Sequence, residues 1–184
     1  MIELKDASIR RDGRVLFKDV NLQIHPGWKI GLTGNNGTGK SSFFATLLNQ
    51  KGEGELALDT GSLSVPNSWQ IGHMAQEIES TDQSAIDFVL SGDKEYFELQ
   101  DKINHPDTLS EDELAHVHAR FDDIHGYSTP AKASQIMTGL GFNVAQESQP
   151  VSSFSGGWRM RLNLAKTLMS RADLLLLDEP TNHL

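Results

Sequence analysis

The stretch Gly34-Asn-Asn-Gly-Thr-Gly39-Lys40-Ser41 decides the fold class, because it fits the pattern G-x-x-x-x-G-K-[ST] in full. In this pattern the glycines let backbone N–H groups turn inward around phosphates, and the helix that follows directs its positive end at them. Lys40 is predicted to neutralise the β- and γ-phosphates of a nucleotide, and the Ser41 hydroxyl to ligate Mg²⁺. The simpler alternative is a glycine-rich turn that binds nothing. It is disfavoured because the motif lies between a predicted buried strand, 29–33, and a predicted helix, 41–48. The predicted nucleotide-binding residues of this loop are Gly34, Asn35, Asn36, Gly37, Thr38, Gly39, Lys40, Ser41 and Ser42.

A second motif near the end of the sequence joins an apolar run to two carboxylates. Residues 174–177 are all leucine, and Asp178 and Glu179 follow them. Asp178 is predicted to hold Mg²⁺ through water, and Glu179 to polarise the attacking water. A buried strand that merely ends in solvated acids is the alternative. It is disfavoured beside a phosphate-binding loop, because phosphoryl transfer needs the metal anchored from both sides. The two motifs together predict a nucleotide hydrolase.

The residues between and around these motifs predict an α/β core with a helical insert. Ile2, Leu4 and Ile9 mark an edge strand, 15–17 a short second strand, and 20–24 a further strand with period-two alternation. From 84 to 140 helical spacing dominates, and Ser110 with Glu113 resembles a capping box. The predicted division is one domain over 1–184, with a nucleotide-binding core of 1–81 and 151–184 and a helical subdomain of 82–150.

Composition excludes several classes of protein. The 184 residues contain no cysteine, so neither a disulfide framework nor a thiolate metal site is available. The first residues, Met1-Ile-Glu-Leu-Lys-Asp, carry charges where a signal peptide needs an apolar run, and no stretch is long and apolar enough to span a membrane. We therefore expect a cytoplasmic protein. The net charge of −9 divides into +3 over 1–50, −13 over 51–150 and +1 over 151–184, which favours phosphate binding in the two flanks.

A third motif, Phe154-Ser-Gly-Gly-Trp158, opens a predicted helix over 156–170. Ser155 and the two glycines make another helix N-terminus that can bind an anion. A plain N-cap without a ligand is the alternative. A second phosphate cradle just ahead of the acidic strand calls for a more specific explanation.

With these three motifs the sequence resembles the ATP-binding cassette (ABC) superfamily over nearly its whole length. Phe154–Trp158 is similar to the family's signature motif, L-S-G-G-Q, and the resemblance implies that Ser155, Gly156 and Gly157 bind ATP held by a second cassette. Gln76 follows a predicted strand at the place of the family's Q-loop, which touches Mg²⁺ and the attacking water. The resemblance thus implies the family's fold, an α/β nucleotide-binding domain of the P-loop NTPase type with an antiparallel β subdomain and an inserted helical subdomain. It also implies ATP and Mg²⁺ as cofactors. It implies Glu179, Gln76 and Lys40 as catalytic residues, and Ser41, Gln76 and Asp178 as the metal site.

Within the superfamily the sequence is closest in pattern to the ABC-F class, soluble cassettes that act on the ribosome. Asp178-Glu-Pro-Thr-Asn-His-Leu184 resembles that class, where transporters more often have Ser-Ala in place of Asn-His, and 154–161 resembles the first cassette of YheS-like bacterial members. The resemblance implies a second cassette, binding at the ribosomal tRNA exit site, and an arm. The candidate arm is 93–126; an ordinary cassette helical subdomain is the alternative. The rival functions are the ATPase subunit of a membrane transporter and a module that binds ATP without turnover.

The sequence departs from the family pattern in three places. No aromatic residue that could stack on adenine lies near 10–12, so Arg11 or Phe17 would have to serve. Trp158 replaces the signature glutamine. An interior strand, which carries the family's switch histidine, has no counterpart, and a sheet without it exposes backbone groups along two edges. We therefore expect this sequence to be part of a longer protein, and to bind ATP but hydrolyse it poorly by itself. The candidate arm has 3 Lys/Arg against 10 Asp/Glu, so attraction to phosphates cannot dock it on RNA.

Overall fold

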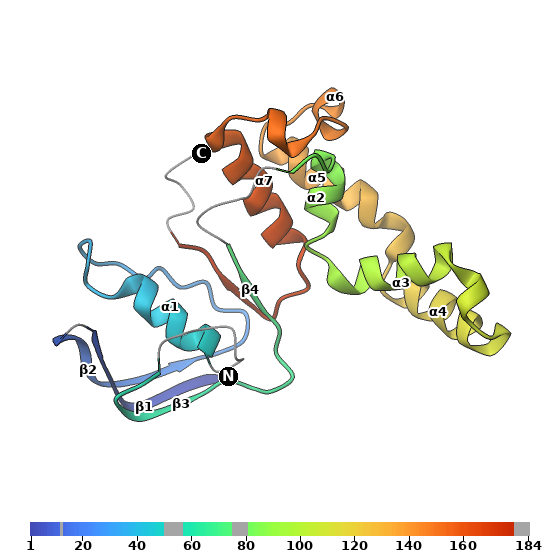
Figure 1. The fold of residues 1–184 in the computed structure, drawn as a ribbon. Coiled ribbons are helices and arrows are strands. Elements are labelled where there is room, and N and C mark those ends of the chain that lie inside the picture. Colours follow the sequence, from blue (N-terminus) through green and yellow to red (C-terminus); the bar gives the residue numbers. More distant parts are fainter. Residues whose placement is uncertain (12, 50–56, 75–80, 179–184) are drawn as a thin grey trace. The chain divides into compact units, whose positions relative to one another are not determined.

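A computed structural model describes residues 1–11, 13–49, 57–74 and 81–178. The chain divides into two compact units. The sheet unit comprises 1–71 and 172–176, and the helical unit comprises 72–171 and 177–184. The structure is therefore mixed α/β, with an antiparallel sheet and a separate group of helices, as the sequence predicts (Figure 1).

The sheet unit contains a three-stranded antiparallel sheet in the order β2-β1-β3. β1 is Ile2–Arg11, β2 is Arg14–Ile24 and β3 is Thr60–Ser64. The predicted edge position of the first strand is wrong, because β1 pairs with β2 on one side and with β3 on the other. The predicted break between 15–17 and 20–24 is also wrong, since β2 is one strand that bends at Asp19, where φ is +51°.

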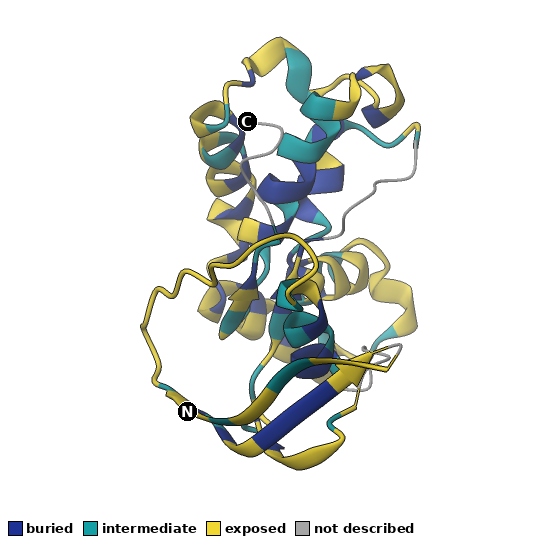
Figure 2. Cartoon of the chain, turned by 90° about the vertical axis from the view of Figure 1, so that its left-hand side faces the viewer, coloured by how far each residue is buried: buried dark blue, intermediate teal, exposed yellow. Residues whose placement is uncertain are grey.

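One face of this sheet packs against helix α1, Lys40–Asn49. Leu4 of β1 and Leu47 of α1 are each 1% exposed and belong to one apolar cluster. The rings of Phe17 and Phe43 meet edge to face with centroids 6.1 Å apart. Figure 2 shows the contrast between this buried layer and the exposed segment that leads to α1. The sheet thus fixes the helix that begins at the phosphate-binding motif.

The predicted buried strand over 29–33 is not formed. These residues have no strand conformation, and Ile30 and Leu32 are 55% and 43% exposed. A strand persists only where its N–H and C=O groups pair with a neighbour. In the part of the chain that the structure describes, no segment pairs with 29–33. The apolar pattern of the sequence is that of a strand inside a sheet, and the described residues do not supply that neighbour.

The helical unit follows the helical pattern of the sequence closely. Its helices are α2 Ala85–Leu90, α3 Lys94–Asn104, α4 Glu111–Asp123, α5 Thr129–Gly139, α6 Val144–Glu147 and α7 Gly156–Met169. Short 3₁₀ turns at Pro106–Thr108, Gly126–Ser128 and Val151–Ser153 connect them. Among the described residues, no helix is long and apolar enough to cross a membrane.

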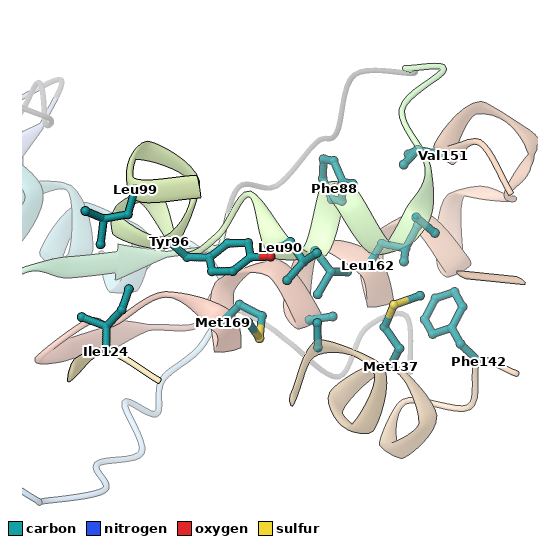
Figure 3. Packing of buried hydrophobic residues seen from close by; sticks show 14 of the residues in the cluster. Phe88, Leu90, Tyr96, Leu99, Ile124, Met137, Phe142, Val151, Leu162 and Met169 are labelled. Atoms are coloured by element: carbon teal, nitrogen blue, oxygen red, sulfur yellow. The ribbon is translucent and has the colours of Figure 1, made fainter. Parts of the chain in front are cut away.

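α7 lies at the centre of the helical unit, where α2 and α5 pack against it (Figure 3). Leu162 of α7 and Met137 of α5 are fully buried in the same cluster. Lys166 in the last turn of α7 lies over the ring of Phe88, its Nζ 4.5 Å from the centroid. Burial lowers the pKa of the Lys166 ammonium, with a smaller contribution from the charge of Lys94.

Two short strands complete the described elements. β4, Ile71–His73, pairs with β5, Leu174–Leu176, in a two-stranded sheet. β4 is the strand predicted ahead of Gln76, and β5 lies within the leucine run of 174–177 that was predicted as the acidic strand. The predicted functional division into a core of 1–81 and 151–184 around 82–150 stays a prediction. The two compact units group residues by packing and not by function, and α7, a part of the predicted core, packs with the helices.

The predicted capping box at the start of α4 is confirmed, and it makes this helix end sensitive to acid. The Glu113 N–H donates to Ser110 Oγ at 3.3 Å, and the Ser110 N–H and Oγ donate to Glu113 Oε2 at 2.9 and 2.7 Å. The hydrogen bond from the Ser110 backbone, followed by that from its hydroxyl, lowers the pKa of Glu113 below its ordinary value. The stabilisation is therefore present above the unfolded pKa and is lost as the pH falls through the lower, folded pKa.

We expect the first turn of α4 to fray as the pH falls below about 4. Nuclear magnetic resonance would detect this as a pH-dependent shift of the amide signals of 111–114. Glu113→Gln is the control, because an amide oxygen accepts the same hydrogen bond without titrating. If the first turn of the Glu113→Gln variant frayed over the same pH range, the prediction would be contradicted.

Candidate functional site

The phosphate-binding motif forms a loop that its own lysine closes. Lys40 is the first residue of α1, and its Nζ donates to the carbonyl oxygens of Gly34 at 2.8 Å and Asn35 at 3.1 Å. An ammonium group has three N–H donors, so these contacts within the described residues leave one for an anion. Thr38 closes the loop further, because its Oγ1 donates to the Asn35 carbonyl at 2.8 Å. The positive charge is thus fixed in the curve of the loop.

Two glycines are required by the backbone of this loop. Gly37 has φ +79° and Gly39 has φ +102°, in the left-handed region that other residues adopt at a cost. At Gly39 a Cβ would also lie 3.0 Å from the Cβ of Leu16 on β2. Glycine at these positions therefore allows the loop both to turn and to approach the sheet.

The start of α1 has the polarity that a phosphate and a hard cation need. Its first turn contains no acidic residue, so the positive end of the helix is not neutralised there. Ser41 is exposed, which leaves its hydroxyl accessible to a metal ion, whereas Ser42 is 7% exposed. The Lys40 ammonium, the start of α1 and the Ser41 hydroxyl therefore fit a nucleoside triphosphate with Mg²⁺.

The start of α7 is a second N-terminus with an accessible hydroxyl. Ser155 is the N-cap in extended conformation, and it is exposed. Within the described residues its side chain makes no capping hydrogen bond to the first turn of α7. Because the Ser155 hydroxyl does not accept a hydrogen bond from the first N–H groups of α7, the hydroxyl and these N–H groups can both bind an anion.

Trp158 anchors this helix start to the helical unit. Its ring meets that of Phe142 edge to face with centroids 4.8 Å apart, and the guanidinium of Arg161 lies 4.9 Å from the Trp158 centroid. Arg161 Nη1 also donates to the carbonyl of Leu140 at 3.2 Å. From the sequence, Trp158 was identified only as the replacement of the signature glutamine. The packing of Arg161 on Trp158 could have been predicted, because the two residues are three positions apart on a predicted helix and therefore share a face.

The remaining predicted site residues are only partly described. Gln76 and Glu179 lie outside the described residues, whereas Asp178 is described and half-buried. The phosphate-binding loop belongs to the sheet unit, and Ser155, Gly156, Gly157 and Asp178 belong to the helical unit. The structure therefore describes the surroundings of the phosphate-binding loop and those of the start of α7 separately.

Of the two candidates for stacking on adenine, Phe17 is the less available. It is half-buried and packs against the cluster that joins the sheet to α1. Arg11 is exposed at the end of β1. The choice between Arg11, through its planar guanidinium, and Phe17 stays a prediction.

Comparison with known proteins points to one family. A family model described as "ABC transporter" matches residues 17–182. A protein of Escherichia coli strain K12 described as "Probable ATP-binding protein YheS" is 44% identical over 185 residues, covering all of this chain and 28% of that protein. Human ATP-binding cassette sub-family F member 3 is 36% identical over 192 residues, covering all of this chain and 26% of that protein.

The fold has counterparts among solved structures. One described as a "Putative ABC transporter (ATP-binding protein)" from Pyrococcus furiosus has a TM-score of 0.66 at 16% identity, covering 98% of this chain and 76% of that one. At that identity the likeness concerns the fold alone. The chain spans about a quarter of the length of the curated relatives it matches.

Proposed function

Because the chain belongs to the ABC transporter family of ATP-binding proteins, we propose that it is the ATP-binding cassette of an ABC-F type ATPase. Its fold is the nucleotide-binding fold of that family, with an antiparallel sheet and a helical unit. The observation that carries the proposal is the loop of 34–39, in which Lys40 Nζ is held on the carbonyls of Gly34 and Asn35.

In this proposal the loop and the start of α1 bind the triphosphate. The backbone N–H groups of 36–42 and the Lys40 ammonium neutralise the β- and γ-phosphates. Ser41, Asp178 and Gln76 are the residues that would hold Mg²⁺. When bound, the metal would supply charge neutralisation for the phosphoryl group that is transferred. Glu179 orients or deprotonates the attacking water, which is the role that a carboxylate after the acidic strand can perform.

The start of α7 serves the nucleotide of a second cassette in this proposal. The exposed Ser155 hydroxyl, with the N–H groups of Gly156 and Gly157, would complete that nucleotide's site. One cassette alone then has an incomplete site, so we expect this chain to bind ATP but to hydrolyse it poorly. ATP binding closes two cassettes and hydrolysis releases them, which makes the nucleotide a conformational switch.

The proposed cellular role rests on the resemblance to the ABC-F class, and the relatives support membership of that class. Both the YheS proteins and sub-family F member 3 match this chain over its whole length. We propose that the full-length protein is cytoplasmic and acts on the ribosome in translation, with the helices α3 and α4 as its arm. The ATP-binding subunit of a membrane transporter is the competing function.

The deciding experiment uses Glu179→Gln in the full-length gene product. Removing the carboxylate should lower ATP turnover about 100-fold while ATP binding persists, because only the water-activating group is lost. The trapped protein should cosediment with 70S ribosomes in ATP and not in ADP. Wild-type protein in ADP is the control. ATP-dependent association with membranes, without ribosome binding, would replace this proposal with the transporter function.

A further inference from the structure

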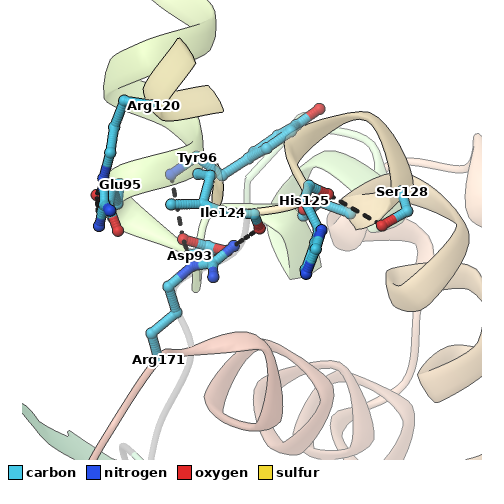
Figure 4. A network of polar contacts seen from close by, with 9 residues as sticks. Asp93, Glu95, Tyr96, Arg120, Ile124, His125, Ser128 and Arg171 are labelled. Carbon is cyan, nitrogen blue, oxygen red and sulfur yellow. Dashed lines mark hydrogen bonds and ion pairs between the residues drawn. The ribbon is translucent and has the colours of Figure 1, made fainter. Parts of the chain in front are cut away.

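Arg171, just after α7, contacts both ends of the helical hairpin, which we define as residues 93–124. Its Nε donates to Asp93 Oδ1 and Oδ2 at 3.0 and 2.8 Å, and its Nη2 donates to the carbonyl oxygen of Ile124 at 2.8 Å (Figure 4). Asp93 is the N-cap of α3 and Ile124 is the C-cap of α4. One side chain therefore holds the first and the last residue of the hairpin.

The partner of Arg171 is a buried charge. The Asp93 side chain is 3% exposed, and its Oδ1 also accepts from the Tyr96 N–H at 3.1 Å. Removing the guanidinium would leave this carboxylate buried without a counter-charge, which is far more costly than losing an exposed ion pair. A lysine could restore the charge but not the fork that reaches both Asp93 and Ile124.

The base of the hairpin also touches the backbone of α7. A Cβ added at Gly92, the residue before Asp93, would lie 1.9 Å from the carbonyl oxygen of Lys166. Only glycine permits that approach. The hairpin base, the end of α7 and Arg171 thus form one closely packed group within the helical unit.

Arg171 is also where the chain leaves the helical unit. Residues 172–176 belong to the sheet unit, and Asp173 is fixed there by Gln70. The Asp173 N–H donates to the Gln70 carbonyl at 2.9 Å, and the Gln70 N–H donates to Asp173 Oδ2 at 2.9 Å. Only Ala172 separates these two anchored residues. β5 begins at Leu174 and leads to Asp178.

We propose that Arg171 is a positioning residue through which the helical hairpin acts on the strand that leads to Asp178. A displacement of the hairpin moves Arg171 with it, and the single residue Ala172 passes that movement to the start of β5. A partner that binds the hairpin can thereby alter ATP turnover without touching the nucleotide. This inference rests on the proposed function, which assigns Asp178 to the ATP site.

A matched control exists within the hairpin itself. Arg120 of α4 donates from Nε and Nη2 to Glu95 Oε1 of α3, both at 2.7 Å. That pair joins the two helices to each other, with side chains 55% and 35% exposed, and the contacts that the structure gives for Arg120 are within the hairpin. Arg120→Gln therefore removes a guanidinium from the hairpin without cutting its link to β5.

The first test measures hydrogen–deuterium exchange in the full-length protein. Arg171→Gln should raise exchange about tenfold or more in peptides covering 94–98 and also in those covering 173–176. Arg120→Gln should leave 173–176 unchanged. Arg171→Lys should fall between wild type and Arg171→Gln. Unchanged exchange at 173–176 in Arg171→Gln would overturn the proposal, whatever happens in the hairpin.

The second test lengthens the link while keeping both anchors. A glycine inserted after Ala172 should leave basal ATP turnover within about twofold and abolish the change in kcat that 70S ribosomes produce, with the KM for ATP unaltered. A retained ribosome response would overturn the proposal. Wild-type turnover that does not respond to ribosomes would instead count against the proposed function, and the exchange at 173–176 would still decide the role of Arg171.

Discussion

Lys40→Ala is expected to weaken ATP binding by this chain at least about 100-fold. Lys40 provides the ammonium group that two carbonyl oxygens of the loop hold in place, and a charge-assisted contact to phosphate is worth about 1.5–3 kcal/mol. Alanine removes the charge and also the two hydrogen bonds that shape the loop. Both losses act on the same site, so about 3 kcal/mol, a factor of about 100, is a conservative expectation. Titration with a fluorescent ATP analogue would measure it.

The matched control is Lys18→Ala. Lys18 lies on β2 in the same unit, is mostly exposed, and pairs with Asp19 at 3.7 Å. It carries the same charge, so its removal changes the net charge equally without touching the loop. We expect ATP affinity within about twofold of wild type, because isolated exposed charges are screened. Equal loss in the two variants would show that ATP binding depends on net charge and not on the loop.

Leu162→Ala is expected to destabilise the helical unit by about 3 kcal/mol. Leu162 is fully buried in the middle of α7, in the cluster that joins α7 to α2 and α5. Truncation loses the burial of the side chain and leaves a cavity, and Leu→Ala changes in such positions cost about 2–5 kcal/mol. Urea unfolding followed by far-ultraviolet circular dichroism would measure the change, because the helical unit contributes most of the helix.

Leu168→Ala on the same helix is the control for this substitution. Leu168 is 39% exposed, so the same chemical change removes much less buried surface and leaves no enclosed cavity. We expect a cost below about 1 kcal/mol. If Leu162→Ala and Leu168→Ala shifted the unfolding curve equally, α7 would not be the central element of this unit.

Features that depend on neighbours in the sequence were predictable from the sequence. The Lys40 loop closes within seven residues, and the box of Ser110 and Glu113 within four. In both cases the groups that make the hydrogen bonds are brought together by local backbone geometry. The helices of 84–140 and α7 were predictable for the same reason, since their apolar spacing is a property of one segment.

Features that depend on pairing between distant segments were not predictable from the sequence. The apolar positions of Ile2 and Leu4 suit an edge strand and a central strand equally, and only the pairing with β3 makes β1 central. The run 29–33 has the composition of a buried strand but no partner among the described residues. Strand position is decided by hydrogen bonds to other segments, which a strand's own sequence does not encode.

The sequence by itself determined that this protein has a phosphate-binding loop, an acidic strand and a signature-like helix start. These motifs work through short runs of backbone, so their residues suffice to specify them. Only the tertiary structure decided that Trp158 packs on Phe142 and that Arg171 holds Asp93. Arg171 and Asp93 are 78 residues apart, and their ion pair exists because α7 packs against α2, the helix that leads into Asp93, and so brings the two side chains together.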